Sequence, residues 1–205
     1  MACDSMACDS MAMTLWLVRH AQPLIAPGVC YGATDVPADA EPTQTAARAL
    51  ALALPQATRV ISSPLQRCEL LMQSVQELRP DLVCNTDVRL VEMNFGRWEG
   101  QRWDAIDREE IDAWTAAFET WRCGGGECVK DVMERVASAW DETRRQAGPT
   151  AWITHAGVIR AATLVARDVR RVADASQWPK EAPGFGQWWC PELPELSELR
   201  QGPSA

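Results

Sequence analysis

The sequence predicts an α/β protein of three layers, in which helices cover both faces of a mostly parallel central sheet. Two observations favour this class. Short apolar runs rich in strand-forming residues alternate along the chain with longer runs of helical composition, which is typical of strands joined by helices. The length of 205 residues suits a single domain with a sizeable core, and 47% of the residues are hydrophobic, close to the globular average.

The first predicted strand is the apolar run TLWLV, residues 14–18, which we interpret as buried. An alanine- and leucine-rich helix over residues 43–54 follows, with Thr43 as its cap. The run TRVIS, residues 58–62, is the second predicted strand.

A further helix is predicted in SSPLQRCELLMQSVQEL, where Pro64 suits the first turn and Ser63 the capping position. The remaining predicted elements are a strand at 81–87, helices at 103–121 and 127–146, a strand at 150–154 and a helix at 156–169. From Gln177 onward no periodicity is visible, and we expect the tryptophans of this tail to pack on the core.

The N-terminal residues contain the string MACDS twice. So short a duplication is not a structural repeat, and we expect residues 1–12 to form a flexible leader and residues 13–205 to form one domain. The N-terminus lacks the basic and apolar regions of a signal peptide, and no apolar run approaches the roughly 18 residues of a membrane span. We therefore expect a cytoplasmic protein that does not contact a membrane.

Charge and cysteine content exclude several classes of partner. The formal net charge of −8 argues against non-specific nucleic-acid binding, which needs a basic surface, but it allows a small anionic ligand. The 8 cysteines are scattered over a chain too long for a disulfide-dense scaffold, so we expect reduced thiols. With 2 histidines and no second cysteine pair, no structural zinc site is expected. The oligomeric state stays open, with a homodimer as one alternative.

Both histidines of the chain, His20 and His155, follow apolar runs in the similar strings LWLVRHA and AWITHAG. Ligands of open α/β sheets bind beyond the carboxyl ends of the strands, so two neighbouring strands would bring both imidazoles to one crevice. Arg19 beside His20, and Arg67 in the helix after SSPL, add two guanidiniums that can fork onto a tetrahedral oxyanion. Each residue alone is more often structural, and their combination indicates an anion site.

Four ordered motifs, LVRHAQP, SSPLQR, EMNFGRWEG and ITHAGVIR, resemble those of the histidine phosphatase superfamily, also called phosphoglycerate-mutase-like. The resemblance extends from Met13 to about Val169. It implies a phosphoglycerate-mutase-like fold and a phosphoric monoester hydrolase that acts on a small phosphorylated metabolite through a phosphohistidine intermediate. It implies no metal and no other cofactor.

By the same resemblance, His20 is the catalytic nucleophile, Glu92 is the catalytic proton donor, and the phosphate-binding residues are Arg19, Arg67 and His155. A neutral imidazole nitrogen can attack phosphorus in line, while the arginines and a cationic His155 stabilise charge on the equatorial oxygens. Glu92 is expected to protonate the leaving alkoxide and then to deprotonate the attacking water.

Two details of the motifs bear on these roles. Glu99 in RWEG is the rival acid, and we interpret it as a structural partner, for example of an arginine. Ala21 and Ala156 stand where many members have glycine, which is tolerable if the backbone there has negative φ.

The loop GVCYGATDVP resembles CYG.TDVP of α-ribazole phosphatases, a subgroup acting in cobalamin biosynthesis. That resemblance implies α-ribazole 5′-phosphate or the phosphorylated cobamide as the substrate. Tyr31 in this loop is either a stacking partner for a heterocycle or a turn residue. Trp114 and Trp121 have helical spacing and are expected to pack in the core. The alternatives are a broad-specificity phosphatase, a phosphoglycerate mutase of the same fold, and a non-catalytic phospholigand-binding domain.

Overall fold

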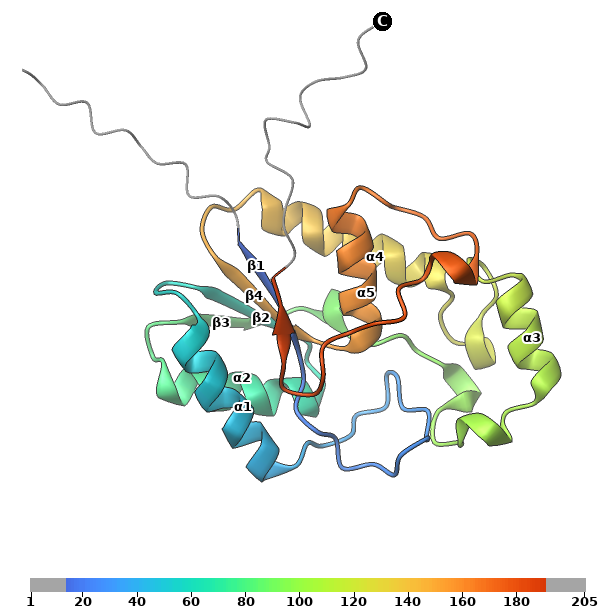
Figure 1. Cartoon of the computed structure of the whole chain (residues 1–205), viewed down its shortest axis with the longest axis horizontal. Coiled ribbons are helices and arrows are strands. Elements are labelled where there is room, and N and C mark those ends of the chain that lie inside the picture. Colours follow the sequence, from blue (N-terminus) through green and yellow to red (C-terminus); the bar gives the residue numbers. More distant parts are fainter. Residues whose placement is uncertain (1–13, 191–205) are drawn as a thin grey trace, which may run out of the picture.

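The computed structural model describes residues 14–190. The predicted leader, residues 1–12, therefore lies outside the described residues. Figure 1 shows a twisted central sheet with helices on both sides, and the last strand in the chain lies beside the first.

The central sheet has the strand order β3-β2-β4-β1-β5. The strands are β1 (Leu15–Arg19), β2 (Arg59–Ser62), β3 (Val83–Thr86), β4 (Thr150–Thr154) and β5 (Trp188–Trp189). Neighbouring strands from β3 to β1 are parallel, and β5 pairs antiparallel with β1. The predicted class, an α/β fold with a mostly parallel sheet, is confirmed.

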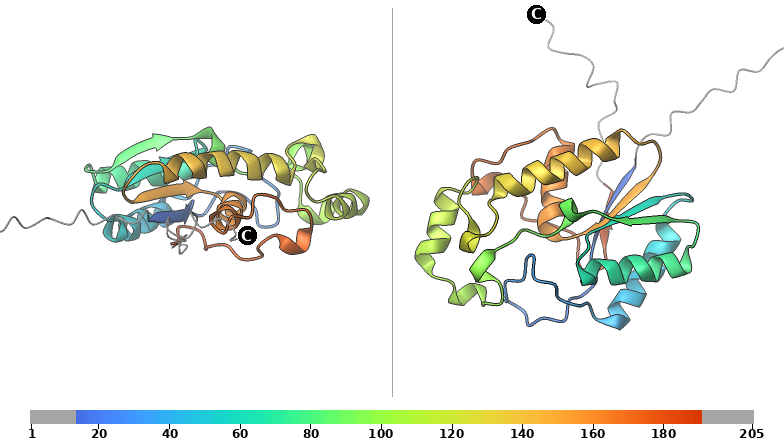
Figure 2. Two further views of the ribbon diagram at one scale, coloured as in Figure 1. Left: turned by 90° about the horizontal axis from the view of Figure 1, so that it is seen from above. Right: turned by 180° about the vertical axis from the view of Figure 1, so that it is seen from behind.

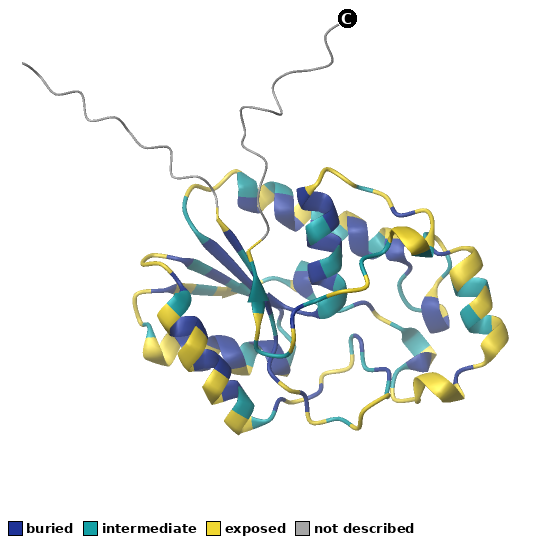
Figure 3. Ribbon diagram, in the orientation of Figure 1, coloured by how far each residue is buried: buried dark blue, intermediate teal, exposed yellow. Residues whose placement is uncertain are grey.

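Helices cover both faces of the sheet, as the view from above in Figure 2 shows. They are α1 (Ala40–Ala53), α2 (Gln66–Leu78), α3 (Arg108–Ala116), α4 (Val129–Arg144) and α5 (Ala156–Ala166). Short 3-10 helices lie at Val88–Leu90, Gly96–Trp98, Trp103–Ala105, Cys123–Gly125 and Ala175–Gln177. Val18 belongs to the core with α1 and α2, and Leu17 to the core with α4 and α5. Because successive strand residues point to opposite faces, β1 contributes to both cores, and Figure 3 shows it buried between the layers.

Helix α1 begins at Ala40, before the predicted start, because the cap is Asp39 and not Thr43. The Asp39 carboxylate accepts a hydrogen bond from the Glu41 N–H at 3.2 Å. Pro42 lies in the first turn, where its missing N–H leaves no intrahelical bond unmade. Thr43 is buried inside the helix and donates from Oγ1 to the carbonyl of Asp39.

Helix α2 begins at Gln66, so the prediction that Ser63 caps this helix is wrong. The residue before the helix is Leu65, which has no side-chain cap bond. The hydroxyl of Ser63 is instead 2.9 Å from Nε2 of His155. A residue predicted to start a helix therefore contacts one of the two histidines.

Two later expectations also differ from the structure. The helix predicted over residues 103–121 is wrong in extent, because Asp107 accepts a hydrogen bond from the Glu109 N–H at 2.9 Å and starts α3 separately from the preceding 3-10 helix. Strand β5 was not predicted, since two residues carry no periodicity. The expectation that the tail tryptophans pack on the core is confirmed for Trp178, Trp188 and Trp189.

The cysteines of the described residues are free thiols, namely Cys30, Cys68, Cys84, Cys123, Cys128 and Cys190. Within residues 14–190, none of the helices has both the length and the apolar character that crossing a membrane requires.

Candidate active site

The two histidines lie at the carboxyl ends of neighbouring strands. His20 follows β1 and His155 follows β4, and the parallel register pairs Arg19 with Thr154, the residues just before them. The backbone N–H of His20 donates to the carbonyl of Thr154 at 2.9 Å. The centroids of the two imidazole rings are 5.1 Å apart. The prediction that both rings meet at one edge of the sheet is confirmed.

His20 is a neutral ring with one free nitrogen. The residue is 2% exposed, and its Nδ1 lies 2.7 Å from the carbonyl oxygen of Ala21. Because a carbonyl only accepts hydrogen bonds, Nδ1 carries the proton and Nε2 keeps its lone pair. Burial, followed by the charge of Arg67, lowers the pKa of His20 to about 3. The Nε2 lone pair is therefore available at neutral pH.

Arg67 is fully buried and links the second histidine to a loop from elsewhere in the chain. Its Nε donates to Nδ1 of His155 at 3.2 Å. Its two terminal nitrogens donate to the carbonyls of Thr34, at 2.8 Å, and Gly32, at 2.7 Å. These bonds fix the guanidinium at the sheet edge without using a carboxylate, so its positive charge remains uncompensated by an ion pair.

His155 carries its proton on the opposite ring nitrogen from His20. Because Nδ1 accepts from Arg67, the proton is on Nε2, which donates to the Ser63 hydroxyl. Burial, followed by the charges of His20 and Arg67, lowers the pKa of His155 well below its ordinary value. His155 is therefore neutral in this environment, and its cationic form stays a prediction for the site with phosphate bound. A phosphate dianion placed beside the ring would favour the cation.

The guanidinium of Arg19 donates one hydrogen bond to a backbone carbonyl and has one buried nitrogen without a partner in the described chain. Nη1 donates to the carbonyl of Pro183 at 3.1 Å. Nε is buried and has no hydrogen-bond partner among the residues that the structure describes. Buried N–H groups are almost always bonded, so an unpaired guanidinium N–H next to His20 is suited to an anionic ligand.

Glu92 is attached to the segment of His155 through the N-terminus of α5. Its Oε2 accepts from the Gly157 N–H at 2.9 Å, and its Oε1 accepts from the Met93 N–H at 3.0 Å. A Cβ added at Gly157 would collide with Oε1 of Glu92, so this contact requires glycine. The sequence string HAG contained this signal, but only the fold shows which carboxylate needs it.

The two alanines that replace glycine in the motifs are compatible with the backbone. In the described chain the non-glycine residues with positive φ are Ala57 and Asp168. Ala21 and Ala156 therefore have negative φ, which is the condition under which a side chain is tolerated there.

Comparison with known proteins identifies the family. Residues 15–174 match the family model of the Histidine phosphatase superfamily (branch 1). The chain belongs to this superfamily. The predicted enzyme class, a phosphatase, is confirmed by this membership. The predicted closeness to α-ribazole phosphatases is not tested by the match, which concerns the superfamily as a whole. A search of curated proteins finds no match.

Solved structures agree with this assignment. The histidine phosphatase is similar to TTHB049 from Thermus thermophilus, with 32% identity, coverage of 75% of this chain and 84% of that one, and a TM-score of 0.59. A mycobacterial glucosyl-3-phosphoglycerate phosphatase solved with VO3 has 25% identity, coverage of 85% and 90%, and a TM-score of 0.70. YhfR from Bacillus stearothermophilus, at 24% identity, coverage of 86% and 89% and a TM-score of 0.72, shows the fold alone.

Glu99, the rival acid, is a structural residue in this histidine phosphatase. Its carboxylate accepts hydrogen bonds from the backbone N–H groups of Ala33, Thr34 and Phe95, and from the hydroxyl of Thr34. The expected structural role is confirmed, but its partners are backbone groups rather than an arginine. Glu99 thus joins the loop that Arg67 contacts to the segment that carries Glu92.

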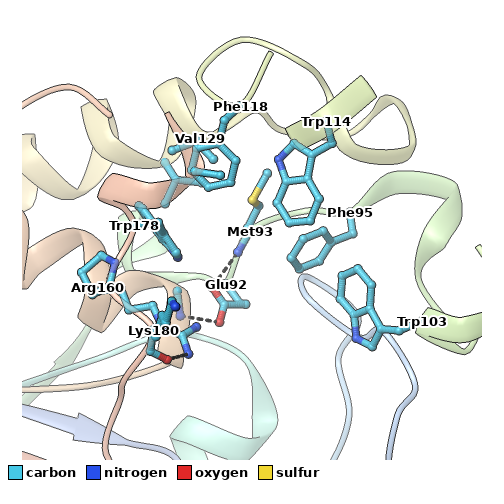
Figure 4. A pocket seen from close by; sticks show the side chains of 14 residues that line it. Glu92, Met93, Phe95, Trp103, Trp114, Phe118, Val129, Arg160, Trp178 and Lys180 are labelled. Atoms are coloured by element: carbon cyan, nitrogen blue, oxygen red, sulfur yellow. Dashed lines mark hydrogen bonds between the residues drawn. The ribbon is translucent and has the colours of Figure 1, made fainter. Parts of the chain in front are cut away.

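An aromatic cavity of about 470 Å³ opens beside Glu92 and Gly157. Figure 4 shows Glu92 at one end of it, with Arg160 and Lys180 close by and aromatic rings along the wall. The rings that line it belong to Phe95, Trp103, Trp114, Phe118 and Trp178. The sequence analysis did not predict this cavity, because its walls come from separate parts of the chain, namely α3 and the loop before it, α4, α5 and the C-terminal tail.

The prediction that Trp114 and Trp121 pack on the core is confirmed, and Trp114 has a second environment besides. Trp121 packs against the buried Trp98, with ring centroids 5.5 Å apart. Trp114 contacts the same core but also lines the cavity. Tyr31 is not among the described residues that line this cavity, and its ring lies 5.3 Å from Cζ of Arg67. Its two alternative roles stay open.

The two neutral histidines predict an acid-sensitive fold. Their pKa values are lowered on folding, so below pH of about 6.5 the unfolded chain binds protons that the folded chain does not, and stability falls as pH falls. Below pH of about 6.5, each histidine lowers the free energy of unfolding by about 1.4 kcal/mol for each pH unit. About one unit of the interval from pH 7.5 to 5.5 lies below that value, so the two histidines together should lower the free energy of unfolding by about 3 kcal/mol. Urea unfolding at the two pH values measures this.

Most carboxylates titrate below this window, so the change isolates the histidines. The variant His20→Asn should lose about half of the pH dependence. A wild-type protein equally stable at both pH values would show that the rings are not neutral in the folded state.

Proposed function

We propose that this phosphatase hydrolyses small phosphate monoesters in two steps through a phosphohistidine on His20. The observation that carries the proposal is the free Nε2 of His20 beside two guanidiniums at the ends of adjacent strands. In the first step Nε2 attacks phosphorus and the bond to the leaving oxygen breaks, while Glu92 gives that oxygen its proton. The Nδ1 proton stays hydrogen-bonded to the Ala21 carbonyl, which stabilises the charge formed on the ring.

In the second step water attacks the phosphohistidine, Glu92 takes a proton from it, and His20 leaves as the neutral ring. Arg19 and Arg67 bind the phosphoryl oxygens in both steps and stabilise the charge that spreads over them. His155 adds a third donor once phosphate replaces Ser63 or Arg67 as the partner of one of its ring nitrogens. Glu92 is suited to both tasks, because its carboxyl group is held between the histidine segment and the mouth of the cavity. The VO3 complex of the mycobacterial relative supports a site for a tetrahedral or related oxyanion in this family.

For the substrate we propose α-ribazole 5′-phosphate. The resemblance of the loop CYGATDVP supports this choice, and so does the aromatic cavity next to Glu92. The leaving group of this substrate is a benzimidazole riboside, whose flat base suits a cavity walled by aromatic rings. In this arrangement the ribose lies between Glu92 and the rings, within reach of Arg160 at the same end of the cavity.

The test is phosphate release from α-ribazole 5′-phosphate, glucosyl-3-phosphoglycerate, 3-phosphoglycerate and p-nitrophenyl phosphate. We expect kcat/KM for the ribazole ester to exceed the others by about 10-fold or more, since burial of an aromatic base contributes about 1.5–3 kcal/mol. Similar low values for all four would indicate a broad-specificity phosphatase. Transfer without release would indicate a mutase, and no turnover a binding domain.

The cavity makes a separate prediction about Trp114. Trp114→Ala should lower kcat/KM for the aromatic ester by about 10- to 100-fold and leave that for glycerol phosphate nearly unchanged, because only the first leaving group reaches the ring. Trp121→Ala is the matched control, since Trp121 does not belong to the described cavity lining. Equal losses on both esters in Trp114→Ala would contradict binding of the base in the cavity.

A further inference from the structure

A segment of the C-terminal tail crosses the end of β1 at the predicted nucleophile. We call residues 183–187 the strap. The Arg19 N–H donates to the carbonyl of Gln187 at 2.9 Å, and the Gly186 N–H donates to the carbonyl of His20 at 3.0 Å. Nη1 of Arg19 donates to the carbonyl of Pro183 at 3.1 Å. The strap backbone is thus bonded to both residues of the Arg-His pair.

The ring of Phe185, in the middle of the strap, contacts the side chains of the same two residues. Its centroid is 3.9 Å from Cζ of Arg19, so the guanidinium lies over the ring face. The same centroid is 5.4 Å from that of His20. The imidazole therefore has Phe185 as one neighbour and His155 as another.

The core does not account for the place of Phe185. Its neighbours Trp188 and Trp189 pack on the two core clusters, whereas Phe185 belongs to neither. The turn that presents the ring needs glycine next to it, because Gly186 has φ of +70° and a Cβ there would collide with Ala46. The local backbone is thus arranged to hold an aromatic ring against the site rather than in the interior.

We propose that Phe185 is a positioning residue, which holds the Arg19 guanidinium for phosphate and shields His20 from water. The proposal rests on the roles proposed for His20 and Arg19. A guanidinium that contacts a ring through its face keeps the N–H groups at its edge available for hydrogen bonds. The buried Nε of Arg19 is such a group, since it has no hydrogen-bond partner among the residues that the structure describes. Shielding by the ring contributes to the burial that keeps the imidazole neutral.

The two effects can be separated by substitution. Phe185→Leu keeps an apolar cover on His20 but removes the aromatic face. We expect it to weaken the binding of inorganic phosphate and of vanadate by about 3- to 30-fold, the range for a partly desolvated cation–π contact. Phe185→Ala removes the cover too, and should also raise the pKa of His20 towards its ordinary value. Phe185→Tyr keeps the ring and should retain both the wild-type affinity for phosphate and the lowered pKa of His20.

Histidine-selective ¹⁵N NMR follows His20 directly, because the chain has 2 histidines and each single replacement assigns the other. Trp188→Leu is the control, since it removes aromatic packing from the adjoining strand without touching the Arg-His pair. Wild-type phosphate affinity in Phe185→Leu together with an unchanged His20 titration in Phe185→Ala would overturn the proposal. Neither measurement needs turnover, so a failure of the hydrolytic mechanism would be seen separately, as activity that survives loss of His20.

Discussion

Replacing His20 with alanine is expected to reduce kcat/KM for every phosphate monoester by roughly 10⁴-fold or more, because the attacking atom is removed. Brief reaction of the wild type with a ³²P-labelled monoester, quenched in alkali, should leave label on the protein that acid then releases, as expected for phosphohistidine. The variant should carry no label. This pair of measurements tests the covalent intermediate and the identity of the nucleophile together.

The matched variant for this test is His20→Asn. Its amide can still donate to the Ala21 carbonyl, as Nδ1 of the histidine does, so it keeps the local hydrogen bond while lacking the nucleophilic nitrogen. It should lose as much activity as the alanine variant and retain more stability in urea. Activity within about tenfold of the wild type in both variants would mean that another group attacks phosphorus.

Replacing Glu92 with glutamine is expected to have an effect that depends on the leaving group. For alkyl monoesters kcat/KM should fall by about 10²- to 10⁴-fold, because the alkoxide leaves poorly without a proton. For p-nitrophenyl phosphate the first step should be nearly unaffected, since nitrophenolate needs no protonation. Removal of the base for the second step should then cause a burst of nitrophenol and accumulation of labelled enzyme.

Glu99→Gln is the control that separates the two acids. Glu99 accepts several backbone hydrogen bonds and Gln would turn a donor towards some of them, so the free energy of unfolding should fall by about 2–4 kcal/mol. Its folded fraction should keep the leaving-group dependence of the wild type. If Glu99→Gln and not Glu92→Gln changed that dependence, the acid would have been assigned to the wrong residue.

The sheet edge with its histidines was predictable because its signals are local. Apolar runs such as residues 150–154 indicate strands by composition, and in a parallel sheet their carboxyl ends meet at one edge. His20 and His155 were thereby expected together, and they are 5.1 Å apart. The family motifs pointed to Arg67 and Glu92 as well, and the fold connects both to the segment of His155.

Helix starts were predicted less well, because several capping residues compete within a few positions. Asp39 and not Thr43 caps α1, and Ser63 contacts His155 instead of capping α2. Which polar group serves the helix and which serves a distant side chain depends on contacts far along the sequence. The pattern of residues around each start does not contain that information.

The sequence by itself determined the class of fold, the family and the residue types that meet at the strand ends, because periodicity and motif order depend on near neighbours. Only the tertiary structure decided the protonation of the two histidines, the aromatic cavity and the contact of Phe185 with Arg19. These properties depend on burial and on charges brought together from separate segments. Desolvation and electrostatic interaction act through space, and only the folded chain brings those groups within their range.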